Sequence, residues 1–200
     1  MYMTWQGGSK MNKKENQRTR LTKMLFKDGL IALLQKKTIY QISVTELCEA
    51  AELNRSTFYK YYNNVRDVLT ELEQETLQRS KQCMQEIAIG EEAFQIAPLY
   101  RLLCHMQNNC EIYKLLLNNS VDDSFPSDMI QETIEFLRNT AKSLNIKEDD
   151  TSDYRFQYLI SGCISVVQNW INSEMKESPM EISKLIYYTS VAVLKSTIDK

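Results

Sequence analysis

The residues from Arg55 to Tyr61 form a short run of side chains suited to hydrogen bonding with a nucleic acid. They are basic, small and polar, or phenolic: Arg55, Ser56, Thr57, Tyr59, Lys60 and Tyr61. Such side chains donate to phosphate oxygens and base edges, and a threonine methyl suits contact with thymine. In a helix, Phe58 and Tyr62 lie one turn apart and would anchor its inward face. The run therefore indicates a helix that lies in the major groove of DNA.

The sequence contains no constellation typical of catalysis or metal binding. His105 is the sole histidine, and the five cysteines are scattered without a Cys-x-x-Cys pair. Cys104 is adjacent to His105, but consecutive residues of a helix point about 100° apart, which disfavours a nucleophile–base pair. Phosphate-binding glycine motifs and a Gly-x-Ser-x-Gly motif are absent from the sequence. We therefore expect no metal and no cofactor, and an enzyme is the least favoured functional class.

Two short helices joined by a three-residue turn are expected to position the polar run. Ser43 and Glu46 have the spacing of a capping box, which predicts the first helix over residues 44–51. Asn54 is a good N-cap for the second helix, over residues 55–61. A longer amphipathic helix precedes them. This layout is typical of a helix-turn-helix.

Composition and charge favour an all-α protein with a basic N-terminal part. Only 5 glycines and 3 prolines occur in 200 residues, which is little for the turns of a β-rich fold. Residues 10–66 contain 12 Lys and Arg against 5 Asp and Glu, a net charge of +7. Residues 67–200 contain 12 against 21, a net charge of −9. This asymmetry is expected when one part of a chain meets a polyanion, and chance clustering of solvated charges is the alternative.

Three segments are expected along the chain. Residues 1–16 are predicted to be a disordered basic tail, residues 17–64 a helix-turn-helix domain of three helices, and residues 65–200 a helical domain for effector binding and dimerisation. With the helices of the last segment the chain has about nine, and no convincing strand. The first of these later helices is expected to end near residue 89. The others are expected over residues 99–109, 111–118, 128–143 and 153–175, and from residue 179 onward.

The sequence predicts neither a membrane span nor export. The longest charge-free stretch, 156–173, is interrupted by glutamine and asparagine, so we expect a helix buried against protein. The odd number of scattered cysteines is typical of a reducing cytoplasm.

The residues named above resemble the DNA-binding domain of TetR/AcrR-type bacterial transcriptional regulators. The resemblance covers about residues 18–75 and rests on Ser43-Val44-Thr45-Glu46-Leu47, Asn54-Arg55-Ser56-Thr57-Phe58-Tyr59-Lys60-Tyr61-Tyr62 and Asp67-Val68-Leu69. Glu52 departs from the pattern, since glycine is common at that turn position. Val65 also departs, standing where a lysine usually begins the fourth helix, with Arg66 beside it. The C-terminal half is more distantly similar to the branch that includes regulators of dihydroxyacetone kinase operons.

The resemblance implies a homodimer that binds a palindrome-like operator in double-stranded DNA, with repression as the commoner outcome. The third helix of each protomer would enter the major groove and place Arg55, Ser56, Thr57, Tyr59 and Lys60 at bases and nearby phosphates. Ser43 and Thr45 are expected at phosphates because the start of their helix presents free backbone donors. Tyr61 is also expected at a phosphate.

Dimerisation is implied to use the last two helices of each protomer. Gly162 lies between Ser161 and Cys163 and makes a small-residue patch where two helices can approach closely. The surrounding helix has an apolar surface too broad for a solvent-facing helix. We therefore expect the interface at Leu159, Gly162, Val166 and Trp170. Burial in the protomer's own core is the alternative.

Regulators of this type are implied to sense a small molecule within the C-terminal helices. The expected pocket residues are Tyr100, Arg101, His105, Tyr113, Phe136 and Tyr154. They suit a small apolar or aromatic effector, although aromatic residues at helical spacing are more often plain core. The alternative function is a co-activator or protein-interaction module that binds a partner protein and needs no small ligand.

Overall fold

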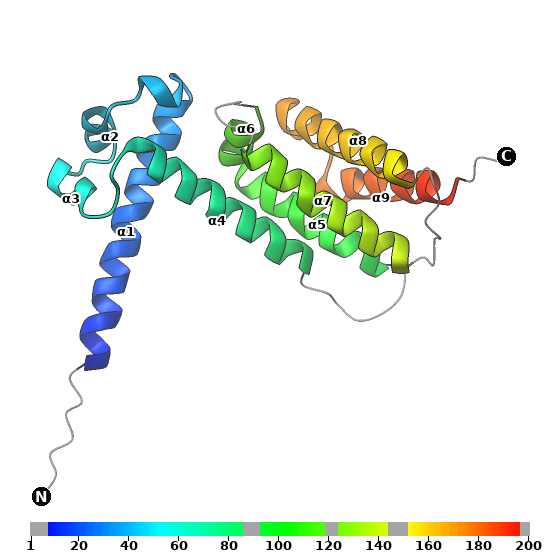
Figure 1. Ribbon diagram of the computed structural model, residues 1–200, viewed down its shortest axis with the longest axis horizontal. Coiled ribbons are helices and arrows are strands. Elements are labelled where there is room, and N and C mark those ends of the chain that lie inside the picture. Colours follow the sequence, from blue (N-terminus) through cyan, green and yellow to red (C-terminus); the bar gives the residue numbers. More distant parts are fainter. Residues whose placement is uncertain (1–7, 86–92, 119–123, 144–151, 197–200) are drawn as a thin grey trace, which may run out of the picture. The chain divides into compact units, whose positions relative to one another are not determined.

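The structure, a computed structural model, describes residues 8–85, 93–118, 124–143 and 152–196 (Figure 1). These residues form nine α-helices, with no strand among them, so the predicted all-α class is confirmed. They divide into two compact units, residues 1–72 and residues 73–200. The division falls within α4 (Val65–Gln85), eight residues beyond the boundary expected after residue 64, because the first turns of α4 are buried in the N-terminal unit.

The N-terminal unit contains α1 (Gly8–Leu34), α2 (Val44–Ala50), α3 (Arg55–Tyr59) and the start of α4. In Figure 1, α2 and α3 lie beside the C-terminal half of α1. The structure differs from the expected tail, since residues 8–16 belong to α1. They include several good helix formers and no proline, which explains the extension. Residues 1–7 of the expected tail lie outside the described residues.

An aromatic cluster forms the centre of the N-terminal unit. The ring of Phe26 from α1 lies edge-on to Phe58 and Tyr62, with centroids 5.3 Å and 6.0 Å away. Phe58 is fully buried and Tyr62 nearly so, as their spacing predicts. Leu30 and Leu47 are also fully buried in this unit. The cluster packs against the inner face of α3, and the opposite face of α3 is exposed to solvent.

Gly29 allows α1 and α2 to approach closely. A Cβ at this position would lie 3.1 Å from the backbone nitrogen of Ala51 and 3.3 Å from the carbonyl carbon of Ala50. Any side chain would therefore push against backbone atoms, which cannot move aside as a flexible side chain can. The helix-turn-helix depends on the absence of a side chain here.

Ion pairs join α1 to α4. Glu71 accepts hydrogen bonds from Lys23 at 2.8 Å and Lys27 at 3.0 Å, and its side chain is a quarter exposed. Burial raises the pKa of the Glu71 carboxyl, but the hydrogen bonds and charges of the two lysines together outweigh it and lower the pKa below 4.5.

Glu71→Gln is expected to lower the free energy of unfolding by about 1 kcal/mol at pH 7, because the ion pairs are partly solvated. A lowered folded-state pKa means that the contribution is present above the unfolded pKa, near 4.5, and is lost as pH falls through the folded value. Urea unfolding of wild type and variant at pH 7 and pH 3 measures the difference. If the difference in unfolding free energy between wild type and variant were equal or larger at pH 3, this role of Glu71 would be contradicted.

The C-terminal unit is a bundle of α5 (Ala93–Asn108), α6 (Cys110–Asn118), α7 (Ser124–Ser143), α8 (Ser152–Asn172) and α9 (Pro179–Lys195). Helix α8 packs against α6, α7 and α9, and α9 also packs against α5 (Figure 1). The predicted start of α9 is present: Ser178 accepts from the backbone nitrogen of Glu181, whose carboxylate accepts from Ser178 in return. No helix in the described part of the chain is long and apolar enough to cross a membrane.

Candidate functional site

Helix α3 presents a polar surface on a buried aromatic base. Arg55, Ser56 and Tyr59 are exposed, whereas Phe58 between them is fully buried. Tyr59 lies edge-on to Phe58 with the ring centroids 5.4 Å apart, so its position depends on the core. Lys60 follows as the C-cap and is also exposed. The structure therefore brings these predicted DNA-contacting residues together on one short element.

Asn54 holds the beginning of α3. Its Oδ1 accepts from the backbone nitrogen of Thr57 at 2.8 Å, as predicted for an N-cap. The same oxygen accepts from the hydroxyls of Ser56 at 2.7 Å and Thr57 at 2.8 Å. Both hydroxyl protons point to the cap, so these two residues face a ligand mainly as acceptors.

The two basic side chains of this surface both lie against tyrosine rings. The guanidinium carbon of Arg55 is 5.9 Å from the centroid of Tyr59, and Nη2 is 3.5 Å from the Tyr59 hydroxyl. This contact raises the pKa of Arg55, which is charged at any physiological pH. Lys60 Nζ is 5.4 Å from the ring centroid of Tyr61. The Tyr61 hydroxyl lies 3.5 Å from Thr19 on α1, which makes Tyr61 a residue of the unit's own packing as well as a candidate phosphate contact.

The start of α2 is capped by its own side chains. Ser43 and Glu46 form the predicted capping box, in which the Glu46 carboxylate accepts from the backbone and hydroxyl of Ser43 at 3.0 Å and 2.9 Å. A hydrogen bond from Lys37, with those from Ser43, lowers the pKa of Glu46 to about 2. The expected phosphate site at Ser43 is therefore next to a carboxylate. Thr45 is exposed on the first turn.

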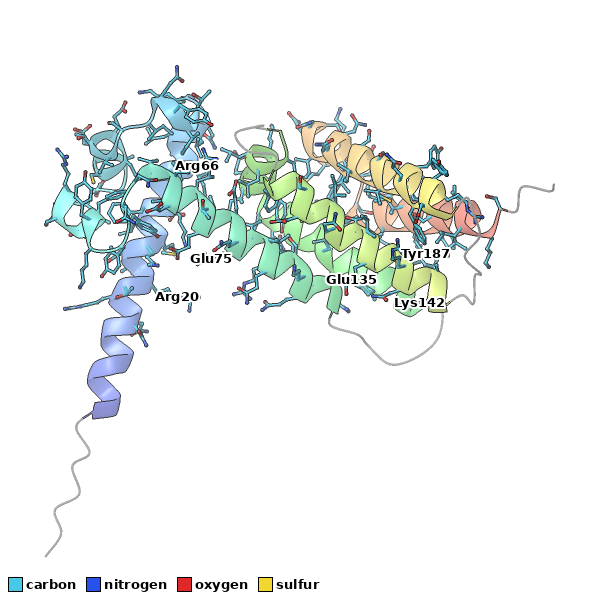
Figure 2. All side chains as sticks on the ribbon, viewed as in Figure 1. Arg20, Arg66, Glu75, Glu135, Lys142 and Tyr187 are labelled. Carbon is cyan, nitrogen blue, oxygen red and sulfur yellow. The ribbon has the colours of Figure 1, made fainter. Side chains whose placement is uncertain are left out.

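A pair that the sequence did not single out lies nearby. The exposed Tyr40 precedes α2, and its hydroxyl is 3.4 Å from Nη1 of Arg66 at the start of α4. Figure 2 labels Arg66 at this position. Val65, which replaces the usual lysine, is buried. Arg66 therefore supplies the positive charge at this end of α4, and no local sequence signal links it to Tyr40, 26 residues earlier.

The turn between α2 and α3 tolerates a non-glycine residue. Glu52 has φ 54°, in the left-handed region where glycine is usual. Its side chain is exposed, so it meets no steric conflict with the core. The departure from the family pattern at Glu52 therefore leaves the motif intact.

The expected effector residues do not surround one cavity. Tyr113 is fully buried, with its hydroxyl 2.7 Å from that of Ser80, and burial raises its pKa to about 12. His105 lies edge-on to Tyr113, with its pKa lowered by burial and by the charge of Arg79. Arg101 donates to the carbonyl of Cys83 at 3.3 Å.

The remaining three residues of that set are dispersed. Tyr100 is half-buried, and a hydrogen bond with the Cys104 thiol raises its pKa. Tyr154 is 74% exposed. The side chain of Phe136 lies outside the described residues.

A cavity of about 90 Å³ lies instead among α5, α6, α7, α8 and α9. None of the five expected residues with a described side chain lines it. Its walls are almost wholly apolar, and none of the described side chains that line it is charged. The polar side chains are Thr133, Cys163 and Gln168, and Gln168 donates to the carbonyl of Leu117 at 3.1 Å. The spacing of apolar residues within one helix cannot predict this cavity, because residues from five helices line it.

The outer face of α8 and α9 differs from the expected interface. Leu159 and Trp170 are 3% and 2% exposed, and Trp170 Nε1 donates to the Glu177 carbonyl at 2.9 Å. Both side chains lie in the protomer's own core and are unavailable to a partner, which corrects that part of the prediction. Val166 is half-buried. Gly162 is exposed, and a Cβ there would meet nothing within 4 Å.

Both α8 and α9 expose aromatic or aliphatic residues. Tyr154 and Tyr158 of α8 are 74% and 69% exposed, and Leu185 and Tyr188 of α9 are 52% and 61% exposed. Tyr158 and Tyr154 lie about one and two turns before Gly162 on the same side of α8. None of these four side chains is charged, and tyrosines of this kind are enriched in protein interfaces.

No group of side chains in the described segments has the composition of a metal site.

Comparison with known proteins gives consistent matches. Residues 96–190 match a family described as "Transcriptional regulator C-terminal region" (TetR_C_8). A curated relative, the "Uncharacterized HTH-type transcriptional regulator YxbF" of Bacillus subtilis (strain 168), is 21% identical over 168 residues. That alignment covers 80% of this chain and 42% of the relative, so the chain spans about two fifths of its length.

Solved structures show the same fold along nearly the whole chain. A TetR transcriptional regulator from Streptococcus agalactiae 2603V has a TM-score of 0.68 at 20% identity, covering 90% of this chain and 98% of that one. The dihydroxyacetone kinase operon activator DhaS has a TM-score of 0.59 at 17% identity, covering 87% and 96%. Together with the helix-turn-helix, these results show that the chain is similar to TetR-family transcriptional regulators, by sequence in its C-terminal region and by fold along nearly its whole length.

Proposed function

We propose that the chain acts as a homodimer that binds a palindrome-like operator and represses transcription there until a small effector releases it. The observation that carries this proposal is the exposed polar and basic surface of α3 and its C-cap, held on the buried ring of Phe58. A recognition helix needs both properties, since its outer face must reach base edges while its inner face fixes its position.

Charge supports DNA as the partner of the N-terminal unit. Residues 10–66 carry a net charge of +7 within a chain whose total is −2. Arg20 on α1 and Arg66 on α4, both labelled in Figure 2, add to the basic residues of α3. Positive charge concentrated in one unit strengthens phosphate binding and speeds association.

The apolar outer face of α8 and α9 supports the dimer. Its exposed large side chains are Tyr154, Tyr158, Leu185 and Tyr188, and Gly162 is exposed on α8. A glycine exposed on a helix surface allows two helix backbones to approach closely. Two protomers related by a two-fold axis would then present two α3 helices to a two-fold-symmetric operator.

The apolar cavity supports an uncharged effector. A charged ligand would lose its hydration among walls that offer no opposite charge, which is costly. The volume, about 90 Å³, is smaller than the roughly 150 Å³ of an engineered cavity that holds benzene. The effector is therefore a small apolar molecule, or the walls shift to admit a larger one. A regulator of this kind works in the bacterial cytoplasm, on the nucleoid.

Selection of the purified protein against a random duplex library tests the proposal. We expect enrichment of a palindrome-like site and steeply salt-dependent binding to it. Enrichment of no site by a folded protein would overturn the proposal and favour the co-activator function. On the enriched site, benzene should weaken binding and benzoate should not. The opposite order would overturn the uncharged effector.

Lys60→Ala is expected to reduce the salt dependence of operator binding. Each phosphate contact contributes about 0.9 to the slope of log K against log salt, so a dimer should lose about 1.8. Fluorescence anisotropy from 50 to 200 mM salt, roughly a fourfold range, measures both slopes. Lys142→Ala is the matched control, because this exposed lysine lies on α7 in the other unit. An unchanged slope for the Lys60 variant would remove Lys60 from the phosphate contacts.

A further inference from the structure

The side chains of α3 are not equally available for reading bases. The hydroxyl groups of Ser56 and Thr57 both donate to Asn54 Oδ1, at 2.7 Å and 2.8 Å. Redirecting either proton to a base would break a hydrogen bond that supports the helix cap. Asn54 accepts all of these bonds through Oδ1, the same oxygen that a paired amide contact with adenine would need. These three residues are therefore poorly placed to act as donors to base edges.

Arg55 is an exposed donor of α3 whose guanidinium has a contact within the same helix. It is exposed at the first position of α3, and its guanidinium lies over the Tyr59 ring with Nη2 3.5 Å from the hydroxyl. Tyr59 in turn is fixed edge-on to Phe58, which is fully buried. A guanidinium held in this way loses less conformational freedom on binding than a free arginine side chain.

The geometry of the guanidinium selects among bases. Two parallel N–H groups match the O6 and N7 acceptors of guanine in the major groove. Adenine is instead matched by an amide and cytosine by a carboxylate, and α3 contains neither side chain. Lys60 carries a single ammonium group, which suits a phosphate better than a pair of base acceptors.

We infer that Arg55 reads a guanine in each half of the operator and that Tyr59 is its positioning residue. This inference rests on the proposed function, since it assigns a base to the same DNA-binding surface. It makes Tyr59 act through Arg55 rather than through a base contact of its own.

The test measures base preference at each guanine of the selected operator by fluorescence anisotropy. For the wild type, exchanging the critical G·C pair for A·T should lower affinity about 5- to 150-fold per half-site. For Arg55→Ala the same exchange should change affinity less than about twofold, because the paired N–H groups that distinguish guanine from adenine are gone. Replacing that guanine with 7-deazaguanine keeps its base pairing and removes only N7, so the wild type should lose affinity and Arg55→Ala should not.

Two further variants distinguish guanine recognition by Arg55 from the effect of its charge and from an effect on protein stability. Arg55→Lys keeps the charge, so it should retain affinity for non-specific DNA while losing guanine discrimination. Tyr59→Phe keeps the ring and removes the hydroxyl near Nη2, so discrimination should fall while thermal stability and non-specific affinity stay unchanged. A purely structural role for Tyr59 would instead lower stability and the affinity for all sequences together.

The outcomes separate this inference from the proposed function. An enriched operator in which no base preference depends on residue 55 would overturn the guanine assignment alone. Equal guanine discrimination by Arg55→Lys and the wild type would overturn it as well. If Tyr59→Phe discriminates like the wild type, the positioning role is wrong. Absence of any enriched sequence would overturn both proposals.

Discussion

Replacing Phe58 by alanine is expected to lower the free energy of unfolding of the N-terminal unit by about 3–5 kcal/mol, the range for phenylalanine-to-alanine changes in cores. Phe58 is fully buried and contacts the rings of Phe26, Tyr59 and Tyr62. Its removal opens a cavity beneath α3 and takes away the surface on which Tyr59 rests. Operator binding should therefore be lost together with stability.

Urea unfolding followed by the aromatic near-UV signal measures this loss, and anisotropy measures binding. Phe58→Leu is the matched control, because it keeps a large apolar side chain and should cost about 1.5 kcal/mol or less. Operator binding should survive in the leucine variant at low temperature. A loss below about 1 kcal/mol for the alanine variant, outside the expected range, would show that the cluster does not hold α3.

Gly162→Leu is expected to abolish dimerisation while leaving each protomer folded. A side chain at Gly162 meets no atom of its own protomer within 4 Å, so the protomer has room for leucine. Replacing glycine in a helix also raises helix propensity, by about 0.5–1 kcal/mol. The protomer should thus become slightly more stable, and any loss of dimer must come from the partner surface.

Light scattering measures the oligomeric state, and thermal unfolding measures protomer stability. In the proposed dimer two α3 helices bind one operator, so loss of the dimer should weaken operator binding by more than tenfold, about 1.4 kcal/mol or more. Gly162→Ala supplies the graded control, since it gains helix propensity with a much smaller group. If the leucine variant still forms a tight dimer, the interface does not include this part of α8.

Elements specified by neighbouring residues were predictable from the sequence. The Ser43–Glu46 and Ser178–Glu181 capping boxes and the Asn54 cap join residues only three apart, so the pattern alone locates these helix starts. The inward position of Phe58 and Tyr62 follows from one helical turn.

Helix α8 shows where periodicity is insufficient. Its apolar residues occupy more than one side, so the sequence could not decide between a core and an interface. The structure buries Leu159 and Trp170 in the protomer and exposes Tyr154, Tyr158 and Gly162. Packing against α6, α7 and α9 made that choice, and none of these contacts is local in sequence.

The sequence by itself determined the helical class, the helix-turn-helix and the basic character of the N-terminal unit, because caps, helical spacing and charge act over short distances. Only the tertiary structure decided which side chains line the apolar cavity, which face of α8 remains exposed, and that Arg66 lies against Tyr40. Those features join residues tens of positions apart, and their geometry arises only when the helices pack.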